Sequence, residues 1–311
     1  MTGWLIAILL LVLLPLGGVA LHFFHRSKAL SRKLDESNER RREITNFLMR
    51  FSTGLQGDEG VAGAMHADMC EIFTDVDGIY SADPRHVKGC VKMKEITNTE
   101  MLEMARLGAG VMQPRSVELG MKYHIPIHVR STFTDEEGTI IREVCTMDGK
   151  NEAVRGVAQD AHAARIAVLG LRNIPGVAYM VFSALAEDNI TVDMIVQSVR
   201  NSNDDKTDII FTIEDTDLPD AKRVLEQMRD EGKLEEVIYD DDTAKVSVVG
   251  AGMLGTPGVA ARMFGALGKA GVNIDIVSTS EISISCLILR KDLDKAVQAI
   301  HDEFFPAAKA E

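Results

Sequence analysis

The chain has 311 residues, enough for two or three domains, and its 46% hydrophobic and 26% charged residues are ordinary for globular protein. The net charge of −13 at pH 7 argues against nucleic acid as a partner, because contact with phosphates requires a basic surface. The four cysteines lie far apart, without the spacing of a disulfide framework or a zinc site. We therefore expect an acidic protein with neither a metal site nor a nucleic-acid partner.

An apolar segment stands near the N-terminus. Residues 4–24 carry no charged side chain and have about the 20 residues needed to cross a bilayer. A secretory signal is the alternative, but its positive charges would precede the apolar run, whereas here they follow it, at Arg26, Lys28, Arg32 and Lys33. This order predicts a transmembrane anchor over residues 1–24, with the soluble part of the chain in the cytoplasm.

Residues 25–66 have the composition of a polar stalk. Apolar residues at loosely helical spacing, among them Leu30, Ile44 and Leu48, predict a helix, and a Gly-rich break follows around Gly54 and Gly60. The stalk joins the next segment abruptly at about residue 67. A natural fusion and a misassembled gene both fit this join, and the second would make the protein simply cytoplasmic.

The segment from Cys70 to Arg85 has the features of a nucleotide site. Ile72 and Phe73 end an apolar strand, and residues 74–78 then turn the chain with side chains that can accept hydrogen bonds from a ribose or a purine amine. Tyr80 and Arg85 would face phosphate. An ordinary turn is the alternative, because Asp-Gly and Asp-Pro are common turn formers.

The order Thr-Asp-Val-Asp-Gly-Ile-Tyr-Ser-Ala-Asp-Pro-Arg over residues 74–85 closely resembles the nucleotide-binding segment of aspartate kinases, which are amino-acid kinases. Residues 101–109, 113–118 and 129–133 resemble the same family, and Lys92 matches a family lysine that meets nucleotide phosphates, although a surface lysine is the alternative. The resemblance implies a site for ATP with Mg²⁺, as substrate, formed by Thr74, Asp75, Tyr80, Ser81, Ala82, Asp83, Pro84, Arg85 and Lys92.

Residues 67–134 are predicted to be part of an amino-acid kinase α/β domain. Thr97 and Glu100 have the spacing of a capping box that starts a helix, and Pro114 suits the first turn of the next helix. Alternating residues from Ile125 to Val129 predict a strand. An acidic, glycine-containing linker over residues 135–152 should lead out of this domain.

The remainder is an internal repeat. The motif Pro-Gly-Val-Ala at residues 175–178 recurs at 257–260, and further matches share the same offset of 82 residues. Each copy predicts strand, helix, strand, strand and helix, with a closing strand at 237–239, which is a ferredoxin-like unit. The pair resembles the tandem ACT domains of aspartate kinases, over residues 153–240 and 241–311. Residues 153–158 could join either sheet, because the two modules of that family can exchange strands.

The two Pro-Gly helix starts are candidate ligand sites. Free N–H groups at a helix N-terminus bind a carboxylate, although a plain helix start is the alternative. A Gly-x-Gly-x-x-Gly run at 250–255 is not read as a cofactor site, because the first copy lacks it, so we expect no tightly bound cofactor. The resemblance implies that lysine or threonine binds at Asn173, Ile174, Pro175, Gly176, Val177, Ala178, Thr191, Val192, Asp193, Gln197, Val259, Ala260, Asn273, Ile274, Ser280 and Glu281.

The resemblance implies a phosphotransferase, aspartate kinase, which transfers phosphate from ATP to the side-chain carboxylate of L-aspartate in the first step of lysine, threonine and methionine biosynthesis. The family's Lys-Phe-Gly-Gly-Thr-Ser and Arg-Gly-Gly-Ser-Asp motifs do not occur in the sequence, so no catalytic residue is identified and we expect the chain to be inactive alone. The alternative is a non-catalytic regulatory subunit that binds lysine or threonine. Its expected assembly is a homodimer through the ACT domains, or a complex with a catalytic aspartate kinase chain.

Overall fold

The structure is a computed structural model, and it describes residues 47–50, 67–145, 153–199 and 205–306. All described residues belong to one compact unit, Asn46–Glu311. The predicted anchor over 1–24 and most of the predicted stalk therefore lie outside the described residues. Among the described helices, none combines the length and the apolar composition that crossing a membrane would need.

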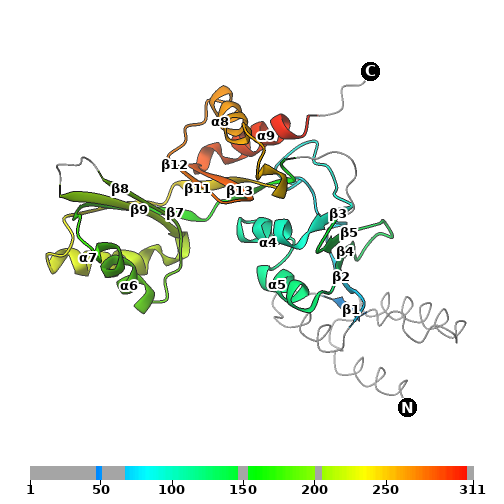
Figure 1. The fold of residues 1–311 in the computed structure, drawn as a ribbon, viewed down its shortest axis with the longest axis horizontal. Coiled ribbons are helices and arrows are strands. Elements are labelled where there is room, and N and C mark those ends of the chain that lie inside the picture. The colour runs from blue at the N-terminus through cyan, green and yellow to red at the C-terminus, as the bar shows by residue number, and fades with distance from the viewer. Residues whose placement is uncertain (1–46, 51–66, 146–152, 200–204, 307–311) are drawn as a thin grey trace, which may run out of the picture. The chain divides into compact units, whose positions relative to one another are not determined.

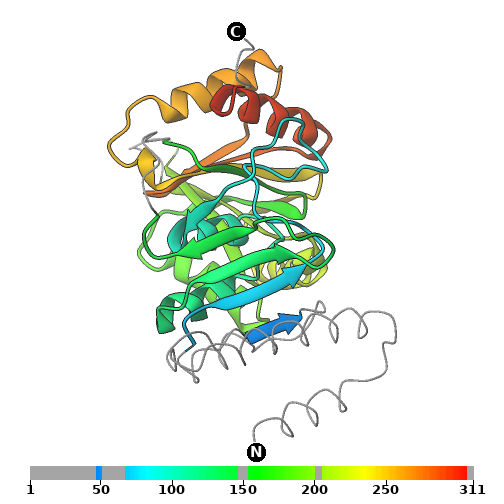
Figure 2. The same cartoon turned by 90° about the vertical axis from the view of Figure 1, so that its right-hand side faces the viewer.

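The N-terminal domain, residues 67–145 with the strand β1, is built on a five-stranded sheet. Its order is β1 (Phe47–Arg50), β2 (Cys70–Thr74), β4 (Ile127–Ser131), β5 (Thr139–Arg142) and β3 (Glu95–Thr97). The strands β1, β2 and β4 are parallel, and β5 runs antiparallel to β4 (Figure 2). The helices α4 (Asn98–Arg106) and α5 (Pro114–Tyr123) share a core with the sheet, in which Met101 and Val117 meet Ile127.

Both predicted helix starts in this domain are confirmed. The Thr97 hydroxyl accepts a hydrogen bond from the Glu100 N–H at 3.2 Å, and the Glu100 carboxylate accepts one from the Thr97 N–H at 3.3 Å, which is the reciprocal pattern of a capping box. The helix α5 begins with Pro114, whose missing N–H costs nothing in the first turn.

Two of the predictions for this domain are corrected. The stalk helix predicted over 25–66 is wrong at residues 47–50, which form β1 and pair with β2. The linker predicted over 135–152 contains β5, in which Ile141 is fully buried. The backbone N–H and C=O groups along the edges of β2 and β4 need partners, so short segments with weak signals of their own are recruited as strands.

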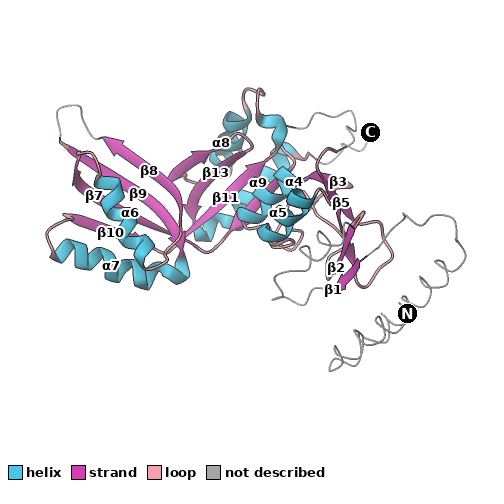
Figure 3. Cartoon of the chain, turned by 60° about the horizontal axis from the view of Figure 1, so that its bottom comes forward, coloured by secondary structure: helices cyan, strands magenta, loops and turns pink. Residues whose placement is uncertain are grey.

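The first module contains β7 (Ala163–Arg172), α6 (Val177–Glu187), β8 (Val192–Val199), β9 (Lys206–Glu214), α7 (Leu218–Asp230) and β10 (Glu236–Asp240). Its sheet is antiparallel, in the order β10-β7-β9-β8. Both helices cover the same face of this sheet (Figures 1 and 3). Phe211 of β9 packs there against Leu185 of α6 and Leu225 of α7, so the predicted ferredoxin-like unit is confirmed.

The second module contains β6 (Gly156–Asp160), β11 (Thr243–Val249), α8 (Val259–Lys269), β12 (Ile276–Thr279), β13 (Ser283–Leu289) and α9 (Leu293–Phe304). The sheet order is β12-β13-β11-β6, with α8 and α9 side by side on one face (Figure 1). The strand β6 pairs with β11. The sequence analysis placed residues 153–158 at the start of the first module and allowed them to join either sheet, and the structure assigns their strand to the sheet of the second module. There β6 takes the edge that β10 takes beside β7.

The repeated Pro-Gly pairs begin α6 and α8 in the same way. Gly176 and Gly258 precede the helices with φ of 93° and 96°, a left-handed conformation that side chains with a Cβ disfavour. A Cβ at either position would meet no atom within 4 Å, so glycine is required here by the backbone and not by crowding.

The two modules touch through the open faces of their sheets. Met194 of β8 is buried with Ile276 of β12 and Leu287 of β13 in a small apolar cluster of its own. The short 3-10 helices η1 (Asp215–Asp217), η2 (Ala251–Met253) and η3 (Arg290–Asp292) connect the remaining elements.

Candidate nucleotide and effector sites

A cavity of about 980 Å³ lies beside the end of β2 and the loop that follows it. The strand β2 delivers the loop at Thr74, and hydrogen bonds between Ile79 and Met93 and between Ser81 and Val91 fold the loop back on itself. Most of the nucleotide residues expected from the sequence line this cavity, namely Thr74, Asp75, Tyr80, Ala82, Asp83, Pro84 and Arg85.

The other walls of the cavity come from elements that the sequence analysis did not assign to the site. The helix α4 contributes Met101 and Met104, and the second module contributes residues 157–159 of β6. The start of α5 contributes Gln113, Arg115 and Ser116. The sequence analysis did not assign Arg115 to the nucleotide site. The family resemblance over residues 113–118 was the signal that could have identified it.

Two arginines, Arg85 and Arg115, line the cavity together with two carboxylates, Asp75 and Asp83. Arg85 is 82% exposed and is held by Asp83, whose carboxylate accepts hydrogen bonds from Nη2 at 2.7 Å and Nε at 3.0 Å. The bond from Arg85 keeps the pKa of Asp83 below its usual range. Arg115 makes no ion pair with any residue that the structure describes, and the N–H groups of the first turn of α5 add partial positive charge beside it. This arrangement suits a phosphate group.

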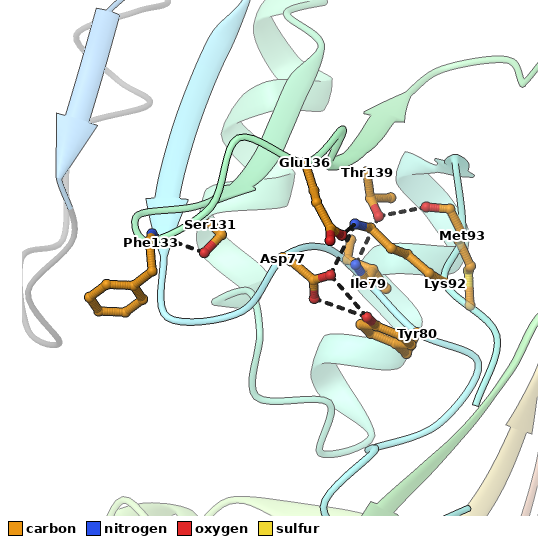
Figure 4. A network of polar contacts seen from close by, with 9 residues as sticks. All are labelled: Asp77, Ile79, Tyr80, Lys92, Met93, Ser131, Phe133, Glu136 and Thr139. Atoms are coloured by element: carbon orange, nitrogen blue, oxygen red, sulfur yellow. Dashed lines mark hydrogen bonds and ion pairs between the residues drawn. The ribbon is translucent and has the colours of Figure 1, made fainter. Parts of the chain in front are cut away.

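Lys92 and Ser81, the two remaining nucleotide residues, do not line the large cavity. The Lys92 ammonium lies 3.1 Å from Asp77 Oδ2 and 3.3 Å from Glu136 Oε2, and the Tyr80 hydroxyl donates to Asp77 Oδ1 at 2.9 Å (Figure 4). Asp77, Tyr80 and Glu136 border a neighbouring cavity of about 330 Å³. A phosphate that used Lys92 would therefore compete with two carboxylates.

These contacts set the charges in the network. Burial alone would raise the pKa of Asp77, but hydrogen bonds from Lys92 and Tyr80 bring it below the usual value. Burial would likewise lower the pKa of Lys92, and its bonds to Asp77 and Glu136 raise it instead. Burial and the hydrogen bond to Asp77 raise the pKa of the Tyr80 phenol. At neutral pH Lys92 and Asp77 are therefore both ionised.

Gly78 allows this network to close. Its φ is 149°, and a Cβ there would come within 2.7 Å of the Thr139 hydroxyl and 3.0 Å of the Lys92 Cε. The Thr139 hydroxyl accepts from the Ile79 N–H at 2.8 Å and donates to the Met93 carbonyl at 2.6 Å (Figure 4). Glycine therefore lets the loop approach β5, which the sequence analysis had placed in a linker.

Most of the residues expected to bind an effector lie near the helix starts and strand starts of the two modules, whereas Gln197 lies inside β8 and Ser280 and Glu281 lie between β12 and β13. Neither cavity described above includes any of them. Pro175, Gly176, Val177 and Ala178 begin α6, and Val259 and Ala260 begin α8. Three polar residues of the expected set form hydrogen bonds with other side chains of their own module. The Gln197 amide donates to the Thr207 hydroxyl, the Asn273 amide donates to Asp275, and the Ser280 hydroxyl lies 2.8 Å from the Ser283 hydroxyl. Apart from Asp193, the remaining members of the expected set are Asn173, Ile174, Thr191, Val192, Ile274 and Glu281.

Asp193 was expected to contact an ammonium group, and the structure gives it one from the chain itself. Its carboxylate binds the ammonium of Lys245 from β11 of the second module. The equivalent acid of the second copy, Asp275, lies 3.4 Å from Arg165 of β7 in the first module. Each of the two related acids is thus paired with a cation of the other module.

Comparison with known proteins agrees with this architecture. Residues 59–131 match the amino acid kinase family, and residues 166–228 and 246–304 match the ACT domain family. An aspartokinase of Mycolicibacterium smegmatis is 45% identical over 245 residues, which are 78% of this chain and 58% of that protein. The chain thus spans about three fifths of this relative.

Solved structures show the same fold. The aspartate kinase of Clostridium acetobutylicum superposes with a TM-score of 0.69 at 26% identity, over 79% of this chain and 57% of that one. Escherichia coli aspartokinase III gives a TM-score of 0.65 at 25% identity in complex with aspartate and ADP, and 0.63 at 26% in complex with lysine and aspartate. Each of these covers 79% of this chain and 54% of the other. With part of an amino-acid kinase sheet followed by two ACT domains, the chain belongs to the aspartokinase family.

Proposed function

We propose that the chain contributes the nucleotide-binding part of an aspartokinase, which transfers phosphate from ATP to the side-chain carboxylate of L-aspartate. The carrying observation is the cavity of about 980 Å³ beside β2, lined by the family's nucleotide segment with Arg85 and Arg115. ATP with Mg²⁺ is the proposed ligand, because the cavity combines polar turn residues with two cations and a helix N-terminus. The ADP in the E. coli relative supports this choice.

Arg115 provides the test of nucleotide binding. We expect Arg115→Ala to weaken binding of a fluorescent ADP analogue with Mg²⁺ by about tenfold, because a hydrogen bond to a charged group contributes about 1.5–3 kcal/mol. Lys122→Ala on the same helix is the matched control, because it removes the same charge from an exposed residue outside the cavity. Binding that is equal in both variants, or absent from the wild type, would contradict the nucleotide site.

We further propose that an amino acid, lysine or threonine, binds to the two modules and regulates the kinase. Helix N-termini at Val177 and Val259 offer N–H groups for its carboxylate, and the E. coli relative was solved with lysine. Calorimetry on the full chain should give a binding isotherm with one of the two amino acids at millimolar concentration. No heat with either would contradict the proposal, and normal binding by Asp193→Ala would show that Asp193 does not hold the ammonium.

A regulatory subunit that partners a catalytic aspartate kinase chain is the second candidate. The observation that favours it is the absence from the sequence of the two family motifs that hold the phosphoryl group and the aspartate. A homodimer is the alternative assembly, and the edge strands of the two described modules, which could pair, are β8 and β10 in the first and β6 and β12 in the second. The membrane anchor over residues 1–24 stays a prediction for both candidates.

A further inference from the structure

The nucleotide loop is anchored in two different cores. Ile79 and Met93 belong to the core of the N-terminal domain. Between them in the sequence, Ala82 and Val87 are 4% and 2% exposed and belong to the core of the second module, with Val297 of α9. The middle of the loop is thus packed as part of the second module, although both of its ends belong to the kinase sheet.

Polar side chains on one face of α9 contact the same part of the loop, residues 81–88. The His86 Nδ1 lies 3.0 Å from Asp294, and the Lys88 N–H donates to the Gln298 side chain at 2.8 Å. One turn further along the helix, the His301 Nε2 lies 2.8 Å from the Ser81 hydroxyl. Positions 294, 298 and 301 are spaced by four and three residues, so they share a face of the helix.

The hydrogen bond between Ser81 and His301 differs from the other two because it is buried. His301 is 1% exposed and stacks on Phe305 with ring centroids 4.9 Å apart. Burial lowers the pKa of the His301 imidazole, which is therefore neutral at neutral pH. Its other ring nitrogen, Nδ1, has no hydrogen-bond partner within the described ranges.

The Ser81 hydroxyl has two polar partners. It accepts a hydrogen bond from the Val91 N–H at 2.9 Å and lies 2.8 Å from His301 Nε2. The Ser81 carbonyl accepts from the Val157 N–H of β6 at 2.7 Å. Ser81 thus joins the returning strand of the loop, the helix α9 and the strand β6 at one point.

Neither Ser81 nor His301 lines the nucleotide cavity, whereas Tyr80 and Ala82, which flank Ser81, both do. We propose that His301 is a positioning residue that sets the conformation of the nucleotide loop through Ser81, so that the second module controls the affinity for nucleotide. The inference rests on the proposed nucleotide site. A shift of α9 must either carry Ser81 with it or break the buried hydrogen bond between Ser81 and His301, which couples the module to the cavity.

The test compares two replacements of His301 in the full chain. His301→Leu removes the imidazole and leaves the Ser81 hydroxyl bonded only to the Val91 N–H, and we expect it to weaken binding of a fluorescent ADP analogue with Mg²⁺ by about tenfold. His301→Gln returns an amide near the position of Nε2 and should recover most of the affinity. Ser81→Ala breaks the same hydrogen bond from the loop side at a residue that does not line the cavity, so it should weaken nucleotide binding to a similar extent. The Ser81→Ala, His301→Leu double variant should lose little more affinity than either single variant.

A control and a second readout separate positioning from general damage. Val181→Ala weakens the core of the first module, which the loop does not touch, and should leave the affinity unchanged. Hydrogen exchange at the Val91 and Val157 amides, which donate to Ser81, should accelerate in His301→Leu and Ser81→Ala but not in Val181→Ala.

The two readouts give distinguishable failures. If the wild type binds no nucleotide, the proposed function fails, and the exchange at Val91 and Val157 still decides whether His301 positions the loop. Unchanged affinity together with unchanged exchange in both His301→Leu and Ser81→Ala would overturn the inference. A loss in His301→Leu that His301→Gln does not recover, with Ser81→Ala behaving as the wild type, would overturn it as well.

Discussion

No 4-phosphoaspartate above background is expected from the 311-residue chain alone when ATP, Mg²⁺ and aspartate are supplied. Phosphoryl transfer depends on positioning and on neutralising the charge that develops in the transition state. Removal of a single preorganised donor costs about 10²–10³ in kcat, and the sequence contains neither the family's Lys-Phe-Gly-Gly-Thr-Ser motif nor its Arg-Gly-Gly-Ser-Asp motif. Without a loop that holds aspartate, proximity is lost too.

The measurement is the trapping of the acyl phosphate with hydroxylamine after prolonged incubation. An Arg85→Ala, Lys92→Ala double variant purified in parallel reports contamination by host kinase, because a contaminant would give the same signal in both preparations. Product that forms with the wild type and disappears in the double variant would contradict the prediction. It would mean that residues outside the family's motifs hold the γ-phosphate and the aspartate.

The repeat was the part of the fold that the sequence predicted best. An offset of 82 residues between two Pro-Gly-Val-Ala motifs is a long-range signal, and the elements around it have strong periodicity, as in the buried strand β11. The strands β1, β3 and β5 were missed because they have three or four residues each and owe their conformation to neighbours in the sheet. The acidic residues and the glycine just before Thr139 have a composition typical of a loop, so the sequence analysis assigned β5 to a linker.

The sequence predicted the part of the candidate nucleotide site that lies in one continuous segment, but not the parts that distant segments contribute. The string over residues 74–85 identified the loop, because turn residues and family resemblance lie in one continuous segment. The wall from β6 and the docking of Ala82 and Val87 in the second module involve residues more than 60 positions apart, which no local pattern reveals. Lys92 was placed with the phosphates, but the structure holds its ammonium between Asp77 and Glu136.

The ion pair between the two modules should be strongly asymmetric in its contribution to stability. The Lys245 side chain is only 6% exposed, whereas its partner Asp193 is 53% exposed. Asp193→Ala leaves a buried ammonium with only Asp160, at 3.6 Å, and we expect it to lower the free energy of unfolding by about 2–4 kcal/mol, because an uncompensated buried charge is costly. Lys245→Met leaves an aspartate that water can reach, so its cost should be smaller.

Urea unfolding of the single variants and of the Asp193→Ala, Lys245→Met double variant measures this asymmetry. The double variant should be more stable than Asp193→Ala alone, because it removes the ammonium that the single variant strands in the protein. Asp188→Ala is the control, because its pair with Arg223 lies in the same module, but the arginine is 59% exposed, and such exposed pairs contribute about 0.2–1 kcal/mol. An Asp193→Ala effect no larger than that of Asp188→Ala would mean that water reaches Lys245. The acid would then be available to an effector's ammonium without first releasing a buried lysine, and the link between the two modules would depend instead on the apolar cluster around Met194 and Leu287.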